Sequence, residues 1–389
     1  MRTLLYVTVA WVALGVLAGD RHVPEFVETL RFGGGNGGDA YVWTDTTTSL
    51  SVDAAGRIYV ADTGAARVLQ FSAEGVFLKE IVSKGQGPGE VESLQGFQML
   101  ADGSAVAFEY KGQGSTLHYF DADLAFVRRA DFTEWKLNPI AYTAAPGGKV
   151  SAITYNRLDP KARQIVTCVA LANGSAVHAL LSETAMPLPD GARLNDKSYW
   201  PEFFAGLAPL HFDKTGLVAF GSDGRVFRAL SDTYQVHVLN ADLHDTGKTI
   251  SRKVDKLPWT EIDLDDLASS ISEEYLQAYP PQFKNFITPE TVRKGLDMAG
   301  VPAGRNPLKA LIAMEHGGLM VVLDEPGPPR TQFADLFAAD GTFLGQVTNA
   351  NTGFASSTGQ PRMVFSGGFA YTLETDEEGE HSVVRYRLN

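Results

Sequence analysis

Short runs of alternating apolar and polar positions, rich in β-branched and aromatic residues, recur along most of the chain. The first copy contains two three-residue turns that end in glycine, Ala54-Ala55-Gly56 and Ala73-Glu74-Gly75. A period of two residues, interrupted by such turns, is typical of antiparallel strands. The copy predicts four strands, at residues 49–53, 57–62, 67–72 and 76–82. Together they are expected to form one antiparallel sheet.

The pattern returns at spacings of about 40 residues, which is the length that a four-stranded propeller blade needs. The later copies are expected at residues 94–131, 139–182, 217–254, 308–348 and 361–389. The last copy has only three strands, and residues 25–32 form a strand with no hairpin partner of its own. Because a closed ring protects every inner sheet edge, we predict that this strand completes the last copy. The predicted fold is all-β, a six-bladed β-propeller closed by an N-terminal strand.

Connection lengths differ between the two faces of such a ring. The turns that join the first strand to the second, and the third to the fourth, are short. The long connections all belong to the opposite face, at residues 33–48, 85–93, 132–138, 183–216, 255–307 and 349–360. We therefore expect this loop-rich face to carry the function.

The longest connection has a helical pattern. Asp263 is expected to cap a helix, and Leu264, Leu267 and Ile271 follow it at helical spacing. In a second helix, Thr288 is the predicted N-cap and Pro289 stands at the first helical position. Residues 255–305 are thus predicted to be a helical insertion between blades 4 and 5, as a lid or a docking surface.

The N-terminus predicts export. Residues 3–19 carry no charge and follow a single arginine, Arg2. This stretch of 17 residues is long for a cleaved signal peptide and reaches the lower limit for a membrane-spanning helix. Residues 1–22 are therefore either a signal peptide or an uncleaved membrane anchor, and residues 23–389 form the propeller. The predicted location is periplasmic or extracellular, with an anchor in the inner membrane if the segment is retained.

Large aromatic side chains gather in the long connections. Bulky rings with one polar group are enriched at binding hot spots, although they also fasten long loops onto a fold. Both interpretations stay open. The candidate partner-binding residues are Trp43, Trp135, Tyr199, Trp200 and Trp259.

Charge and motif searches exclude several classes of function. A net charge of −13 argues against nucleic-acid binding, which needs clustered Lys and Arg. Cys168 is the only cysteine, so the chain can form no internal disulfide. The glycine run at residues 33–38 matches a dinucleotide fingerprint but opens no helix. No catalytic residue and no cofactor is predicted, and a divalent metal in the central channel stays open.

Two segments carry a resemblance to a known family. Residues 51–82 (SVDAAGRIYVADTGAARVLQFSAEGVFLKEIV) resemble an NHL-type repeat, and residues 84–90 (KGQGPGE) are similar to a segment of bacterial six-bladed, TolB-like propellers. The resemblance is closest over the first copy and weakest over the third copy and the helical insertion. It implies a propeller of a family that includes protein-binding and RNA-binding modules, lyases and lactonases. The enzymes of that family place metal ligands in the central funnel, and this sequence does not match their ligand sets.

Two functions follow as hypotheses. The first is a non-catalytic, extracytoplasmic scaffold or accessory subunit that binds a protein partner, such as a membrane or envelope complex, through its loop-rich face. Residues 3–19 would add a membrane contact if they are retained. The second is a propeller hydrolase or lyase that acts on a small molecule or glycan in the central funnel.

Overall fold

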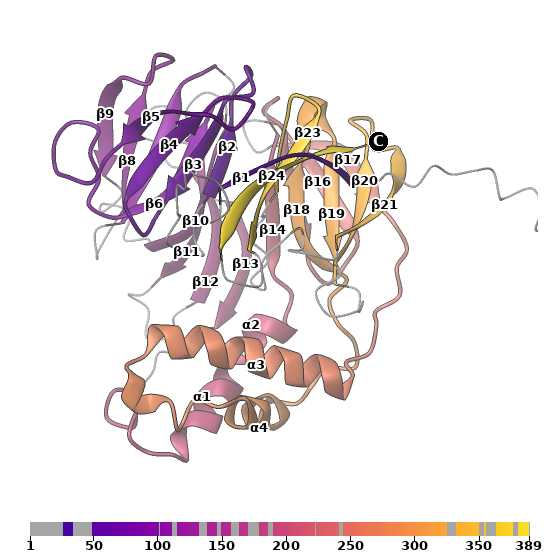
Figure 1. The fold of residues 1–389 in the computed structure, drawn as a ribbon. Coiled ribbons are helices and arrows are strands. Elements are labelled where there is room, and N and C mark those ends of the chain that lie inside the picture. Colours follow the sequence, from indigo (N-terminus) through magenta and orange to yellow (C-terminus); the bar gives the residue numbers. More distant parts are fainter. Residues whose placement is uncertain are drawn as a thin grey trace, which may run out of the picture.

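The computed structural model arranges the strands in a ring and gathers most of the helical residues beyond one of its faces (Figure 1). It describes residues 26–33, 49–100, 102–110, 115–131, 138–145, 149–156, 163–169, 179–185, 190–221, 223–240, 244–324, 332–349, 354, 363–375 and 380–388. The predicted signal peptide or anchor at residues 1–22 lies outside these ranges, as do Trp43 and Trp135.

The described strands form six sheets of four strands each, and every pairing within them is antiparallel. The first three sheets along the chain consist of β2 (Ser49–Val52), β3 (Ile58–Asp62), β4 (Arg67–Phe71) and β5 (Phe77–Val82); β6 (Leu94–Met99), β7 (Ala105–Tyr110), β8 (Ser115–Phe120) and β9 (Phe126–Asp131); and β10 (Asn138–Ala145), β11 (Lys149–Asn156), β12 (Arg163–Val169) and β13 (Ala179–Ala185). Cys168 belongs to β12.

The remaining three sheets complete the ring. They consist of β14 (Gly216–Phe220), β15 (Val226–Leu230), β16 (Gln235–Leu239) and β17 (Asp245–Ser251); β18 (Leu308–Ala313), β19 (Leu319–Leu323), β20 (Gln332–Phe337) and β21 (Phe343–Asn349); and β22 (Met363–Ser366), β23 (Phe369–Thr375), β24 (His381–Leu388) and β1 (Phe26–Gly33). In the last sheet β1 pairs with β24, from Phe26 opposite Leu388 to Gly33 opposite Ser382.

The first strands of the sheets line the inside of the ring. β2, β6, β10, β14, β18 and β22 each contact the next in this order, and β22 contacts β2. The hydrophobic core lies between neighbouring sheets. One cluster joins Tyr59 and Val68 to Phe97 and Phe120, for example, and each of these side chains is buried. Apolar residues on both faces of the sheets are therefore covered by the sheets beside them.

The helices do not come from one insertion. α3 (Glu261–Ala278), a 3-10 turn η2 (Pro281–Phe283) and α4 (Pro289–Ala299) lie between β17 and β18, as predicted. However, α1 (Tyr199–Leu207) and α2 (Pro209–Phe212) lie in the connection between β13 and β14. The prediction of a helical insertion between blades 4 and 5 is therefore incomplete, because it missed the helices in the connection between β13 and β14. Helices α3 and α4 alone leave their apolar faces open, and α1 supplies the surface that covers them.

The helix boundaries follow their capping residues. Thr288 caps α4 as predicted, because its hydroxyl accepts a hydrogen bond from the backbone N–H of Thr291. The predicted start of α3 is wrong by three residues. Thr260 is the N-cap, and Asp263 closes a capping box by accepting a hydrogen bond from the Thr260 backbone N–H. A short 3-10 turn, η3 (Glu315–Gly317), completes the helical elements of the described chain.

Candidate functional site

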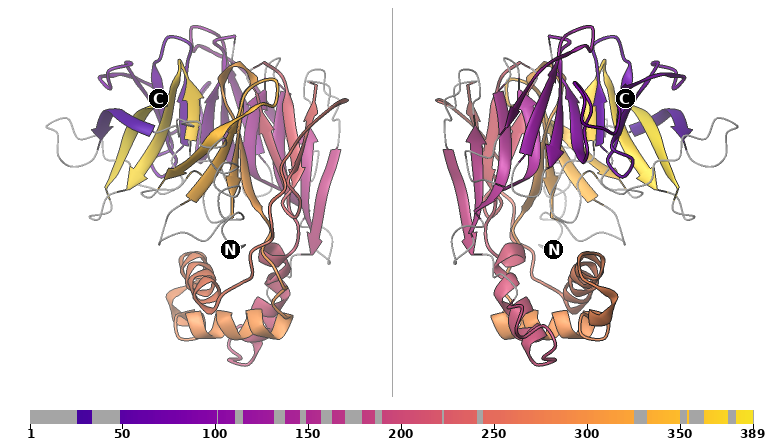
Figure 2. Two further views of the ribbon diagram at one scale, coloured as in Figure 1. Left: turned by 90° about the vertical axis from the view of Figure 1, so that its right-hand side faces the viewer. Right: turned by 90° about the vertical axis from the view of Figure 1, so that its left-hand side faces the viewer.

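Helices α1 to α4 form a separate lobe next to one face of the ring (Figure 2). We define the helical lobe as residues 190–212 and 259–300. Its buried core contains residues of both connections and none from the strands: Tyr199, Trp200, Phe203, Phe204, Leu207, Ala208, Ala268, Ile271, Phe283, Ile287, Val292 and Leu296. Because the apolar burial is internal to the lobe, its stability depends mainly on its own packing.

Trp200 is the central side chain of this core. It is 0% exposed, and the rings of Phe203, Tyr279 and Phe283 lie within 6 Å of its own ring centroid. Its indole N–H donates to the Leu194 carbonyl oxygen at 3.0 Å. The polar end of the ring is thus satisfied while its apolar body is buried.

Helices α1 and α4 approach each other closely at Gly295. A Cβ atom at this position would lie 2.6 Å from the Cβ of Phe204 and 2.8 Å from the Pro201 carbonyl oxygen. Both distances are shorter than van der Waals contact, so the helices could not keep this spacing with a larger residue. Glycine therefore sets how deeply α1 packs against α4.

The lobe joins the ring through a neck, which we define as residues 213–215, 252–258 and 301–307. Arg305 is the central side chain of the neck. Its guanidinium donates to both carboxylate oxygens of Asp324, at 3.1 and 2.8 Å, and to Asp263 at 2.7 Å. Asp324 follows β19 in the ring, whereas Asp263 lies in the first turn of α3. A single arginine therefore bonds the ring and the lobe simultaneously.

Electrostatics favour the charged forms in this contact. Burial alone would raise the pKa of Asp263, but the Thr260 hydrogen bonds and the charge of Arg305 outweigh it and lower that pKa. Burial likewise acts to lower the pKa of Arg305, and the hydrogen bonds and charges of Asp324 and Asp263 raise it instead. Only 12% of the Arg305 side chain is exposed, so water screens these interactions less than it screens a surface ion pair.

Trp259 covers the other side of the arginine. The Arg305 guanidinium carbon lies 4.8 Å from the centroid of the Trp259 ring, and the ring of Phe212 meets that tryptophan at 5.3 Å. This geometry is a cation–π contact. Asn306 adds hydrogen bonds to the carbonyl oxygens of Phe212 and Asp213. Among the described residues, the buried indole N–H of Trp259 has no acceptor.

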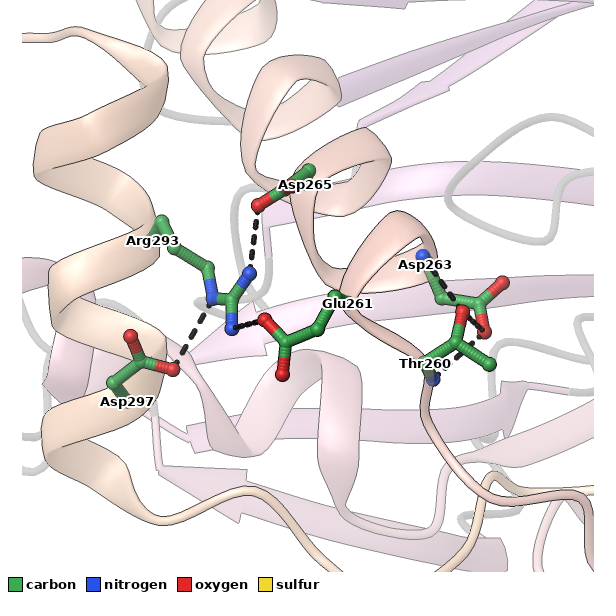
Figure 3. Close-up of polar contacts among 6 residues, drawn as sticks. All are labelled: Thr260, Glu261, Asp263, Asp265, Arg293 and Asp297. Carbon is green, nitrogen blue, oxygen red and sulfur yellow. Dashed lines mark hydrogen bonds and ion pairs between the residues drawn. The ribbon is translucent and has the colours of Figure 1, made fainter.

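A second arginine organises the outer side of the lobe (Figure 3). Arg293 of α4 contacts Glu261 and Asp265 of α3 at 2.6 Å each, and Asp297 of its own helix at 3.1 Å. The three carboxylates are mostly exposed, at 53–83%, and Arg293 is 20% exposed. Hydrogen bonding to Glu261, followed by the other two acids, raises the pKa of Arg293. These pairs align the two helices, although exposed ion pairs add little stability.

The lobe surface is acidic and carries exposed apolar groups. The lobe has eleven Asp and Glu residues against five Lys and Arg residues, a formal charge of −6. Ile262 in the first turn of α3 is 73% exposed, and Met298 near the end of α4 is 53% exposed. Asp266 and Glu273, also on α3, are exposed. This surface can offer apolar contact area surrounded by negative charge.

The structure separates the predicted aromatic residues by role. Tyr199 (7% exposed) and Trp200 belong to the lobe core, so neither side chain is accessible in this conformation. Trp259 lies at the base of the lobe, half-buried under Arg305. Sequence reasoning missed Arg305 and Gly295, because their importance comes from partners distant in the chain. It also missed α1, although Trp200, Phe203, Phe204 and Leu207 recur there at helical spacing.

Acidic side chains buried in the ring have partners within it. Asp62, Glu109 and Glu374 lie near the ends of the second strands β3, β7 and β23 and contact Arg67, His118 and Arg31, respectively. Such pairing accounts for them as part of the fold. Within the described ranges, no three His, Cys, Asp or Glu side chains are grouped closely enough to hold a metal ion. None of the described helices is both long and apolar enough to cross a membrane.

No family model matches the sequence, and no curated protein matches it. Solved structures are similar in fold. A candidate exported protein from Bacteroides fragilis is 9% identical, with 96% of this chain and 97% of that chain covered and a TM-score of 0.46. A member of the DUF4221 family from Bacteroides vulgatus is 10% identical, with 95% and 99% covered and a TM-score of 0.46. Virginiamycin B lyase from Staphylococcus aureus is 8% identical, with 94% and 100% covered and a TM-score of 0.40.

Proposed function

We propose that this chain is a non-catalytic, NHL-type propeller outside the cytoplasm that serves as a scaffold or accessory subunit and binds a protein partner. Its docking surface is the helical lobe, and its partner is a membrane or envelope complex. The hydrophobic residues 3–19 support export, and tether the protein to the inner membrane if they are retained.

One observation carries this proposal: a helical lobe with its own core stands on one face of the ring and exposes apolar side chains within an acidic surface. A packed lobe presents a surface of fixed shape, so little conformational entropy is lost when a partner binds. Ile262 and Met298 add two exposed apolar side chains to this surface. The aromatic residues Tyr199 and Trp200 then contribute indirectly, by keeping the lobe folded.

The test compares two triple variants in a pull-down from native membranes in mild detergent. The lobe variant carries Ile262→Ser, Asp266→Lys and Glu273→Lys, all at exposed positions on α3. The control carries Val127→Ser, Glu80→Lys and Asp123→Lys, also exposed but on the ring. Both variants change charge equally and remove one exposed aliphatic side chain. Deletion of residues 255–305 is a poorer test, because it would uncover the Trp200 side of the lobe core.

We expect the wild-type chain and the ring variant to recover the same membrane protein in stoichiometric amount, and the lobe variant to lose it. Retention by the lobe variant together with loss by the ring variant would move the docking surface to the ring. Recovery of the wild-type chain without any stoichiometric protein would reject the accessory role. The intact mass of the recovered chain shows in the same experiment whether residues 1–22 are retained.

A propeller hydrolase or lyase is the second candidate. The observation that favours it is His211 of α2, whose pKa burial lowers to about 4. Strongly shifted groups concentrate at active sites, although an imidazole with so low a pKa is a weak base at pH 7. Purified protein that contains one divalent metal per chain, and that turns over a small substrate until the metal is chelated, would favour this candidate over the scaffold.

A further inference from the structure

The lobe and the ring have separate hydrophobic cores. Every buried residue of the lobe core comes from residues 199–208 and 268–296, whereas the ring clusters consist of strand residues and residues of the connections beside them. In the described chain the two bodies are joined by the neck, whose contacts are mostly polar, and by the approach of α2 at the base of the lobe to β13. Two packed bodies joined by a polar connection are expected to move as units relative to each other.

Within the neck, Arg305 supplies the contacts that hold the lobe in its observed orientation relative to the ring. It bonds Asp324 of the ring with two parallel hydrogen bonds and Asp263 of α3 with a third. Bidentate arginine–carboxylate pairs fix direction as well as distance. The backbone N–H of Arg305 also donates to the Leu257 carbonyl oxygen at 2.8 Å, so the two sides of the neck are held together at this residue.

The same region contains two buried polar atoms that lack partners among the described residues. One is the indole N–H of Trp259 at the base of the lobe, and the other is a carboxylate oxygen of Asp232 in the ring. Asp232 follows Ser231, which accepts hydrogen bonds from the backbone N–H groups of Thr215 in the neck and of Leu308 at the start of β18. An unpaired buried donor or acceptor is costly, so contact with water or with a reoriented neighbour would stabilise these atoms.

We propose that the helical lobe swings on its neck as one rigid body and that Arg305 is the latch that holds it in the observed seating. Release of the arginine from Asp324 frees the lobe without unfolding it. The lobe surface can then change its orientation over the ring face. This inference concerns motion only and holds whether or not the lobe binds a protein.

Distances between paired spin labels test the latch in the full chain. With Cys168→Ser as background, one pair joins Glu273→Cys on α3 to Glu80→Cys on β5, and reports the position of the lobe over the ring. A second pair joins Glu273→Cys to Glu290→Cys on α4, and reports the fold of the lobe. All three labelled positions are exposed. The latch variants are Arg305→Ala and, from the ring side, the isosteric Asp324→Asn.

Arg293→Ala is the matched control, because Arg293 likewise makes three contacts with carboxylates, but all of them lie within the lobe. We expect both latch variants to widen and shift the lobe-to-ring distance distribution, while the distribution within the lobe stays as in the wild type. The control should leave the lobe-to-ring distribution unchanged. An unchanged lobe-to-ring distribution in both latch variants overturns the proposal. So does a widened distribution within the lobe, since Arg305 would then be holding the lobe folded.

Discussion

On the face that carries the short turns, side chains of one sheet bond the backbone of the next, whereas the lobe on the opposite face is held together by its own core. Arg225 donates to the Ala339 carbonyl oxygen at 2.8 Å, and Arg385 donates to that of Ala73 at 2.8 Å. Glu315 accepts from the backbone N–H groups of Gly367 and Gly368. These contacts cross from sheet to sheet around the ring, while within the described ranges the lobe meets the ring through its neck and its base.

The difference suggests that the face with short turns is rigid, whereas the face with the lobe can vary more freely. Short turns with long-range bonds leave little freedom, and Gly317 shows how tight they are. It has a φ of +77°, and a Cβ there would overlap the Arg225 guanidinium. On the opposite face, the packed side chains belong to the lobe itself, so a change within the lobe need not disturb the ring. Surface loops on a rigid scaffold are where function is usually found.

The largest effect is expected from Trp200→Ala, which tests whether the lobe can unfold while the ring stays folded. Truncation of a fully buried large ring should cost the lobe about 3–5 kcal/mol. Hydrogen exchange would then show that the amides of α1, α3 and α4 lose protection while those of β2–β24 keep it. The variant Trp200→Phe should lose less. Equal loss of protection in the strands would mean that the lobe and the ring unfold as one unit.

Acidification should weaken the lobe next most strongly. The pKa of His211 is lowered from 6.5 to about 4 by burial. Below pH 6.5 the unfolded chain binds a proton that the folded chain refuses, so stability is complete above pH 6.5 and falls as the pH approaches 4. The loss is at most about 3 kcal/mol. Thermal unfolding of wild type and His211→Gln at pH 7 and pH 4.5 checks this, since only the wild type should show this part of the pH dependence.

Gly295→Ala tests the packing of α1 against α4 by adding a single methyl group. The added methyl group would lie too close to backbone atoms of α1 and would push α1 away from α4. We expect the free energy of unfolding of the lobe to fall by about 1–3 kcal/mol. The matched control is Gly191→Ala, where a Cβ meets nothing within 4 Å. Chemical denaturation of both variants gives the difference. A neutral result at Gly295 would show that the helices adjust their spacing at little cost.

Glu315→Gln probes the short-turn face and should have the smallest effect. The amide keeps one acceptor oxygen but brings an N–H group toward the backbone donors of Gly367 and Gly368, which should cost the ring about 1 kcal/mol. Glu74→Gln is the control, because Glu74 bonds only Ser72 in its own turn among the contacts described. Global unfolding midpoints compare the two. A larger loss for Glu74→Gln would contradict the role given to contacts between sheets.

Local patterns predicted the strands well. The first sheet was expected at residues 49–53, 57–62, 67–72 and 76–82, and its strands lie within one residue of these limits. Alternation and glycine turns act between neighbours in the chain, so sequence alone reveals them. The pairing of residues 26–33 with β24 was also accessible, because an unfinished sheet needs a partner.

The site was less accessible because its contacts are distant in sequence. Helix α1 has no capping hydrogen bond from Ser198 and contains Pro201, so the usual start signal is missing. The partnership of Arg305 with Asp324 depends on where the neck returns to the ring. The residues around Gly295 in the sequence do not indicate that Phe204 lies next to it. Trp259 was predicted as a contact for partners, and the structure adds its position against Arg305.

The pairing of β1 with β24 also sets the earliest time at which the ring can close. β24 is made long after its partner β1, and at roughly 5–20 residues per second the wait between them lasts on the order of 20–70 seconds. During this time β1 has no partner strand. Its charged residues Glu28 and Arg31, which pair with each other at 2.7 Å, keep its exposed edge unattractive to other strands. The last segment to arrive therefore decides when the molecule becomes one ring.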